Sequence, residues 1–98
     1  MPSRFAVYVM TNRARVLYVG ATGHLRERVE QQRLGLGSPF VREHRITRLV
    51  HVEFFERPRD AVRRERRLRR MVRWRLVRLV ARTNPEWRDV GEPSFAMM

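Results

Sequence analysis

The sequence predicts a small α/β (α+β) domain in which a sheet of three short strands packs against helices. Three observations predict this fold class. Residues 5–10 and 16–20 form two apolar runs rich in β-branched and aromatic side chains, separated by a short polar turn. Residues 49–55 form a third run of this kind, and residues 58–82 repeat apolar side chains at helical spacing. A chain of 98 residues is long enough for one domain.

The first apolar run predicts the central strand, because its continuous apolar character suits burial on both faces. The second run follows at hairpin distance and is expected to pair with it antiparallel. Whether Tyr8 and Tyr18 share a face depends on the register of that pairing. In the third run Val50, Val52 and Phe54 alternate with the intervening side chains, and we expect a small mixed sheet.

A first helix is expected at residues 24–34, where helix formers occur without Gly or Pro. Thr22-Gly23 supplies an N-cap candidate, and Leu25, Val29 and Gln32 would form the inner stripe of this helix. The Gly and Pro residues that follow end it, and a loop or a short helical turn leads to the third strand.

A longer helix is expected at residues 58–82, with Pro58 in its first turn and Asn84-Pro85 after its end. We expect Pro85-Glu86-Trp87 to pack back on the body of the domain. We assign residues 1–90 to a single domain and residues 91–98 to a flexible C-terminal tail.

Composition limits the function classes that need consideration. The 22 basic residues are all Arg and face 10 acidic ones, so the net charge of +12 attracts polyanions, and the absence of Lys excludes Schiff-base chemistry. The absence of Cys removes disulfides, thiol nucleophiles and the usual zinc sites. The longest apolar run is far shorter than a membrane span of roughly 20 residues. A cytoplasmic protein with no membrane partner and no small-molecule cofactor is expected.

Glu65 is the most informative single position, because it lies on the apolar stripe of the second helix between Ala61 and Leu68. An acid in that place must be paired, protonated or bound to a cation. One interpretation is a salt bridge with Arg28 or another arginine. The other is a ligand for a hard divalent ion, since a Mg²⁺ site needs few protein carboxylates when water and phosphate complete it.

Three other side chains have two interpretations each. Arg28 suits a phosphoryl transition state but also suits a solvated helix surface beside acidic neighbours. Tyr8 and Tyr18 are more often core aromatics with a bonded hydroxyl than catalysts. The three histidines lack metal-binding spacing, so zinc is not indicated.

The order and spacing of these residues resemble the GIY-YIG nuclease family. The resemblance is carried by Ala6-Val7-Tyr8, by Tyr18-Val19-Gly20 ten residues after the first tyrosine, by Arg28 ten residues later, and by Glu65. The segments around these positions, Asn84-Pro85-Glu86-Trp87 among them, look like the small single-domain bacterial members. The resemblance extends from about Phe5 to Asp89.

Similarity to that family implies a three-stranded antiparallel sheet flanked by helices and a metal-dependent hydrolysis of DNA phosphodiesters. By the same resemblance Tyr18 would be the general base or would orient the attacking water, with Tyr8 in support. Arg28 would stabilise the developing charge, Glu65 would hold Mg²⁺ or Mn²⁺, and Asn84 would brace the site or contact the phosphate.

The DNA would be held by phosphate contacts, mainly from the second helix, because so dense a set of like charges repels itself unless phosphate relieves it. The sequence is compatible with a branched or single-stranded DNA but does not single one out, and it leaves the oligomeric state undefined. The chain has no room for a separate DNA-reading domain, so low sequence specificity is expected. The expected nucleic-acid contacts are Arg63, Arg64, Arg67, Arg70 and Arg73.

Two departures from the family pattern keep a rival function open. Ala6 replaces the first Gly of the motif, which a strand can absorb. Gln32 replaces the His that many members carry four residues after the Arg, and an amide cannot exchange a proton at neutral pH. The rival is therefore a catalytically weak or inactive nucleic-acid-binding module on the same fold. A third alternative is a basic amphipathic helix lying on an anionic membrane.

Overall fold

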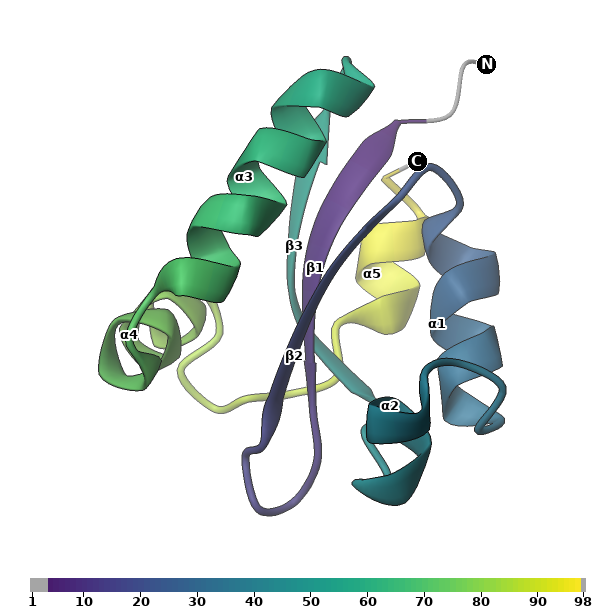
Figure 1. Ribbon diagram of the computed structural model, residues 1–98, viewed down its shortest axis with the longest axis vertical. Coiled ribbons are helices and arrows are strands. Elements are labelled where there is room, and N and C mark those ends of the chain that lie inside the picture. Colours follow the sequence, from purple (N-terminus) through teal and green to yellow (C-terminus); the bar gives the residue numbers. More distant parts are fainter. Residues whose placement is uncertain (1–3, 98) are drawn as a thin grey trace.

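The computed structural model describes residues 4–97, which form one sheet with helices on both of its faces (Figure 1). No helix among the described residues is long and apolar enough to cross a membrane. The elements are, in chain order, β1 (Phe5–Thr11), β2 (Leu17–Thr22), α1 (Leu25–Arg33), α2 (Pro39–Glu43), β3 (Arg48–Phe55), α3 (Pro58–Arg70), α4 (Arg73–Thr83) and α5 (Gly91–Phe95).

The sheet has the strand order β2-β1-β3, and both pairings are antiparallel. The prediction that residues 5–10 form the central strand is confirmed, as is the hairpin between β1 and β2. The expectation of a mixed sheet is wrong, whereas the antiparallel sheet implied by the family resemblance is confirmed. With β1 in the middle, β2 is an edge strand and one of its sides has no strand partner in the sheet.

Each face of the sheet carries its own core. On one face Tyr8 and Met10 of β1 pack against side chains of α1, α2 and α5. On the other face Val7 and Val9 pack against α3 and α4. In Figure 1 the sheet separates α1 and α5 from α3 and α4. The alternation of β1 therefore sends successive side chains into two different cores.

The regular alternation expected for the third strand is interrupted. The register between β1 and β3 shifts between Val9 and Met10, which is a β-bulge. Val50 consequently packs in the core under α3 and α4, while Val52 and Phe54 pack on the opposite face. A sequence pattern alone does not reveal where such an extra residue is inserted.

The long helix expected at residues 58–82 is two helices, α3 and α4, joined through Met71 and Val72. Both joining residues have extended backbone conformations, with ψ of 138° and 148°. A continuous helix over this range would be about 37 Å long at 1.5 Å per residue, whereas the eight residues of β3 span about 27 Å. The break lets Leu68 of α3 and Leu76 of α4 enter the same core.

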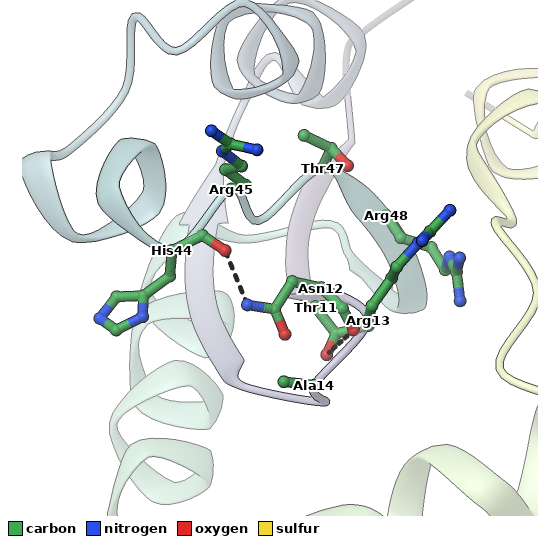
Figure 2. A pocket seen from close by; sticks show the side chains of 8 residues that line it. All are labelled: Thr11, Asn12, Arg13, Ala14, His44, Arg45, Thr47 and Arg48. Carbon is green, nitrogen blue, oxygen red and sulfur yellow. Dashed lines mark hydrogen bonds between the residues drawn. The ribbon is translucent and has the colours of Figure 1, made fainter.

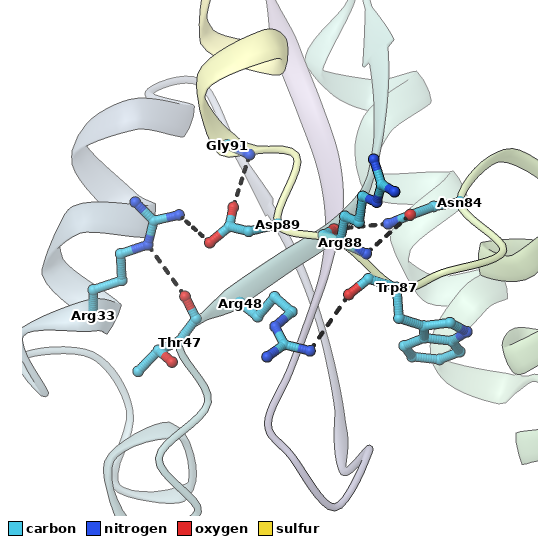
Figure 3. A network of polar contacts seen from close by, with 8 residues as sticks. All are labelled: Arg33, Thr47, Arg48, Asn84, Trp87, Arg88, Asp89 and Gly91. Atoms are coloured by element: carbon cyan, nitrogen blue, oxygen red, sulfur yellow. Dashed lines mark hydrogen bonds and ion pairs between the residues drawn. The ribbon is translucent and has the colours of Figure 1, made fainter.

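The C-terminal segment also differs from the flexible tail that we expected. Residues 91–95 form α5, and Phe95 is buried in the core beside α1. Asp89 anchors this helix, because its carboxylate accepts a 2.6 Å hydrogen bond from Arg33 Nη2 of α1 and one from the Gly91 N–H (Figure 3). Met98 lies outside the described residues.

A partly buried ion network connects α3 to the sheet. Arg64 donates two hydrogen bonds to the Glu53 carboxylate of β3, at 2.7 and 3.1 Å, and His51 Nε2 lies 2.8 Å from the same carboxylate. The hydrogen bond from His51 and the pairing with Arg64 outweigh the effect of burial and lower the pKa of Glu53 from 4.5 to about 2. Pairing with Glu53 in turn raises the pKa of Arg64.

This network predicts a pH-dependent contribution to stability. Because the folded pKa of Glu53 is depressed, its stabilisation is complete above about pH 5 and is lost as the pH falls through 4.5 towards 2. Glu53→Gln should lower the free energy of unfolding by about 2 kcal/mol at pH 7, and the gap from wild type should close by pH 2 to 3. Urea unfolding of both proteins across this pH range measures the difference in the free energy of unfolding. Glu86→Gln, in an exposed pair with Arg88, is the control with little effect, and a gap for Glu53→Gln that is independent of pH would contradict the assignment.

Candidate active site

Tyr8 is fully buried in the middle of β1, and its ring lies over Gly20 of β2. The register pairs these two residues directly. A Cβ atom on Gly20 would stand 2.4 Å from the Tyr8 hydroxyl oxygen, closer than any real side chain could remain. The Tyr8 ring therefore occupies the space that a side chain at position 20 would need. This explains why the residue two positions after Tyr18 is a glycine.

Tyr18 lies on the same face of the sheet as Tyr8, which settles what the sequence left open. Its partner across the hairpin is Met10, and Met10 and Tyr8 belong to one core. The centroids of the two tyrosine rings are 6.4 Å apart. The ring of Phe40 in α2 stacks on the other side of Tyr18, also at 6.4 Å, and the His44 ring lies 4.4 Å from Phe40. Tyr18 is only partly buried, so the aromatic group opens to solvent beside it.

Two polar atoms under this aromatic group are buried without a hydrogen bond to any described residue, the Tyr8 hydroxyl and Gln32 Oε1. Burial, and secondarily the neighbouring Tyr18, raise the pKa of Tyr8 against the opposing influence of Arg28 and Gln32. Tyr8 is therefore protonated at neutral pH and can act as a donor. Unpaired buried polar atoms of this kind are uncommon in cores and are more frequent where a site awaits a ligand or water.

Arg28 and Gln32 come to Tyr8 from α1. Gln32 is buried on the inner stripe with Leu25 and Val29, as the sequence predicted. Arg28 lies on the flank of that stripe, exposed to solvent, and its charge still acts on the Tyr8 hydroxyl. Arg28 is therefore exposed to solvent and close enough to influence the Tyr8 hydroxyl, so its guanidinium group is available to bind a phosphate from solvent.

Glu65 belongs to α3, which packs on the face of the sheet opposite the tyrosines. Its side chain is 21% exposed, and Oε2 lies 3.6 Å from Nη2 of Arg69, one turn further along the helix. Arg69 donates two hydrogen bonds to the Val19 carbonyl oxygen of β2, at 2.8 and 3.2 Å. The Arg69 guanidinium carbon is 5.9 Å from the centre of the Tyr18 ring. Arg69 thus links the carboxylate to the aromatic group.

A groove of about 250 Å³ runs along this edge. Its lining includes Tyr18, Phe40 and Arg69, together with apolar side chains of β2, α3 and α4. Arg69 is the member of this group that sequence reasoning missed, because it was not among the predicted site residues. The i,i+4 spacing from Glu65 was the signal that could have identified it. Phe40 carried no such signal, because its position depends on the fold of the loop before β3.

The residues present fit a divalent ion only in a site completed from outside the protein. The described residues contain no cluster of three or more His, Cys, Asp or Glu that could hold a metal by themselves. Glu65 is partly exposed, and the long distance to Arg69 leaves its oxygens open to further ligands. One carboxylate with water and phosphate oxygens is a donor set that Mg²⁺ accepts.

Asn84 does not join these side chains. Its amide donates to the carbonyl oxygens of Val50 in β3 and of Arg88, and its oxygen accepts the Arg88 N–H (Figure 3). These bonds hold the turn after α4 against β3, the edge strand opposite β2. Both N–H groups of the amide are used in these contacts, so its placement gives no support to the predicted phosphate contact.

The arginines expected to bind nucleic acid fall into two groups. Arg64 is committed to Glu53 and serves the fold. Arg63, Arg67 and Arg70 are exposed and line a hollow of about 700 Å³ along α3, with Arg59 and Arg66 beside them. Arg73 stands at the start of α4 and lines a separate hollow. Four of the five expected arginines are therefore accessible to a polyanion.

A further hollow, of about 560 Å³, lies beside the turn between β1 and β2 (Figure 2). Asn12 of that turn donates a 2.6 Å hydrogen bond to the His44 carbonyl oxygen, while the His44 ring points away from the hollow. Arg13, Arg45 and Arg48 contribute positive charge here. None of the tyrosines, Arg28 or Glu65 lines this hollow, so it is separate from the predicted site residues.

The contact between Gly20 and Tyr8 predicts a specific mutational effect. Gly20→Ala should lower the free energy of unfolding by about 2–3 kcal/mol, because the new methyl group overlaps the phenol. In a Tyr8→Leu background the same change should cost much less, since the overlapping atoms are gone. Urea unfolding of the four proteins measures this coupling, and equal costs in both backgrounds would show that the glycine serves another purpose.

Comparisons with known proteins show which family this chain matches. The GIY-YIG catalytic domain family matches residues 4–74. The chain is 31% identical to a UPF0213 protein of Clostridium perfringens over 75 residues, covering 76% of this chain and 81% of that one. It is 33% identical to UPF0213 proteins of Natronomonas pharaonis (76% of this chain and 88% of that one) and of Bacillus velezensis (67% of each). No solved structure gives a significant match.

The family match spans both tyrosines, Arg28 and Glu65. The α+β architecture, with its antiparallel sheet, is that expected of a nuclease-type fold. The chain belongs to the GIY-YIG family.

Proposed function

We propose that this protein is an endonuclease that hydrolyses DNA phosphodiester bonds with low sequence specificity, using Mg²⁺ or Mn²⁺. The observation that carries the proposal is the continuous set of contacts along the edge of β2. The two tyrosine rings are 6.4 Å apart, Arg69 lies 5.9 Å from Tyr18, and Glu65 lies 3.6 Å from Arg69. Tyr18 and Arg69 thus line one groove, and Glu65 is linked to it through Arg69.

In the proposed reaction water attacks the phosphorus atom, the new P–O bond forms, and the bond to the leaving sugar oxygen breaks. Tyr18 is the partly exposed phenol, so its oxygen can hold the attacking water. As it takes a proton from that water, Tyr18 releases its own hydroxyl proton to solvent, and the leaving sugar oxygen takes up a proton from solvent. Tyr8 is buried with an unpaired hydroxyl and a raised pKa, which suits a donor that keeps Tyr18 or a water in position.

Charge on the phosphate is balanced by two guanidinium groups and one cation. Arg28 approaches from α1 and Arg69 from α3, on opposite faces of the sheet. Glu65 is the residue that would hold the divalent ion, which would act as a Lewis acid towards the phosphate. Preorganised positive charge of this kind is typically the largest contribution to phosphoryl-transfer catalysis.

Affinity for DNA is proposed to come from the exposed arginines of α3 and α4, which contact phosphates and carry no base information by themselves. Low sequence specificity follows from this arrangement.

A binding module without catalysis is the second candidate, and Gln32 favours it. Its buried amide occupies the position where many family members carry His, and Oε1 has no hydrogen-bond partner among the described residues. An amide can position water but cannot transfer a proton at neutral pH. This candidate keeps the arginine surface and loses the chemistry.

A plasmid-nicking assay with Mg²⁺ or Mn²⁺ separates the two candidates. Wild type should convert supercoiled DNA to nicked circles, and Glu65→Gln, Tyr18→Phe and Arg28→Ala should each be slower by on the order of 100-fold. Glu86→Gln, far from the groove on an exposed pair, is the matched acid control and should keep full activity. Should wild type and Glu65→Gln be equally inactive while both still bind the plasmid, the nuclease proposal fails and the binding module stands.

The arginine surface predicts a salt-dependent contribution to DNA binding. Replacing Arg63, Arg67 and Arg70 together with Gln should weaken binding to duplex DNA at low salt and reduce the slope of log K against log salt by about 2–3. Fluorescence anisotropy at 50–200 mM salt measures both quantities. Arg64→Gln is the control, because it should destabilise the fold through Glu53 and leave the slope nearly unchanged. An unchanged slope for the triple variant would remove α3 from the interface.

A further inference from the structure

Trp74, in the first turn of α4, is unusually exposed for a tryptophan. Its side chain is 59% exposed, whereas Trp87 is 3% exposed in the core. Burying an indole contributes strongly to stability, so a fold that leaves one in solvent forgoes that gain. Val72 beside it is also exposed, at 54%. Trp74 and Val72 therefore form an exposed apolar surface, and the indole at its centre does not contribute to the core.

Trp74 lines two hollows, and arginines line both. The first, of about 660 Å³, is formed by Trp74 and Val77 with Arg15, Arg73 and Arg78. The second, of about 320 Å³, is formed by Trp74, Met71 and Leu79 with Arg75, Arg78 and Arg82. The Arg78 guanidinium carbon lies 5.9 Å from the indole centre. An aromatic platform surrounded by guanidinium groups suits a ligand with both a flat ring and negative charge.

The electrostatic surroundings point to a phosphate backbone as the source of that charge. Residues 66–85 contain eight arginines and no acidic residue. Of these arginines only Arg69 forms a salt bridge within the described chain, with Glu65. A surface with so many unpaired cations binds a polyanion strongly and favours no neutral apolar partner.

The surface is continuous with the proposed active site. Met71, at the break between α3 and α4, lines both the groove beside Tyr18 and the second hollow beside Trp74. A strand with a phosphate at Tyr18 therefore has a path past Met71 onto the indole. The extended residues between the two helices, which no Gly or Pro explains, create this path by turning α4.

We propose that Trp74 and its flanking arginines bind an unpaired segment of DNA by stacking a base on the indole, so that this chain prefers DNA with a single-stranded extension or flap. A base inside a duplex has both faces covered by its neighbours, and only an unpaired base offers a face to an aromatic side chain. The link to cleavage rests on the proposed nuclease function, while the binding preference stands independently of it.

The test measures binding without divalent metal, by fluorescence anisotropy, to a labelled blunt duplex and to the same duplex with a ten-nucleotide single-stranded extension. Wild type should bind the extended duplex about tenfold more tightly, since stacking one base contributes on the order of a tenfold gain or more. Trp74→Ala should lose this preference and leave blunt-duplex binding within about twofold. Trp74→Phe should retain most of it, and Leu34→Ala, an exposed apolar control at the end of α1, should retain all of it.

A spectroscopic measurement tests whether Trp74 itself contacts the DNA. Addition of an oligothymidine should quench tryptophan fluorescence in wild type, and the quenching should disappear in Trp74→Phe, whose remaining Trp87 is buried. Equal binding of blunt and extended duplexes by wild type, or an unchanged preference in Trp74→Ala, overturns the proposal. Tighter binding of the matching RNA strand than of DNA would also overturn it. A protein that fails to nick DNA but shows the Trp74-dependent preference refutes the nuclease proposal and leaves this one standing.

Discussion

The arrangement of the site depends on how α3 closes the free edge of β2. Arg69 donates two hydrogen bonds to the Val19 carbonyl oxygen of β2, an edge strand that has a strand partner on one side only. This contact protects an edge that could otherwise pair with another chain. It also fixes the position of Glu65, one turn earlier on the same helix, relative to Tyr18 of the strand. Arg69 thereby connects a carboxylate on one face of the sheet with a phenol on the other.

The second constraint is the contact of Tyr8 with Gly20, which sets the spacing of the two tyrosines. The hairpin register makes them neighbours on one face, and the missing side chain at Gly20 gives the Tyr8 ring its place. Burial keeps the Tyr8 hydroxyl protonated and unpaired, whereas Tyr18 reaches solvent beside Phe40. The two tyrosine side chains therefore differ in burial, and hence in their capacity to donate or accept a proton. Gly20 and one neighbouring helix cause this difference.

Much of this architecture could be predicted from local pattern, and the failures have identifiable physical causes. The strands, the inner stripe of α1 and the central place of β1 follow from periodicity. The break after Met71 does not, because no residue there disfavours a helix, and packing against a sheet of limited length forces the turn. Helix α5 depends on Asp89 meeting Arg33 across 56 positions of sequence. The role of Asn84 in the turn after α4 likewise depends on β3, and the link through Arg69 became visible only once the edge of β2 was known.

The central claim is that Glu65 binds a divalent ion at this edge when DNA is present, and a crystal structure locates that ion most directly. Crystals of the Tyr18→Phe protein with Mn²⁺ and a short DNA duplex, measured at the manganese absorption edge, should show one strong anomalous peak within about 2.0–2.6 Å of a Glu65 carboxylate oxygen. A phosphate oxygen should share that peak, and Arg69 should remain bonded to Val19. A bound duplex with Mn²⁺ elsewhere, or with Glu65 closed against Arg69 and no peak beside it, would contradict the account.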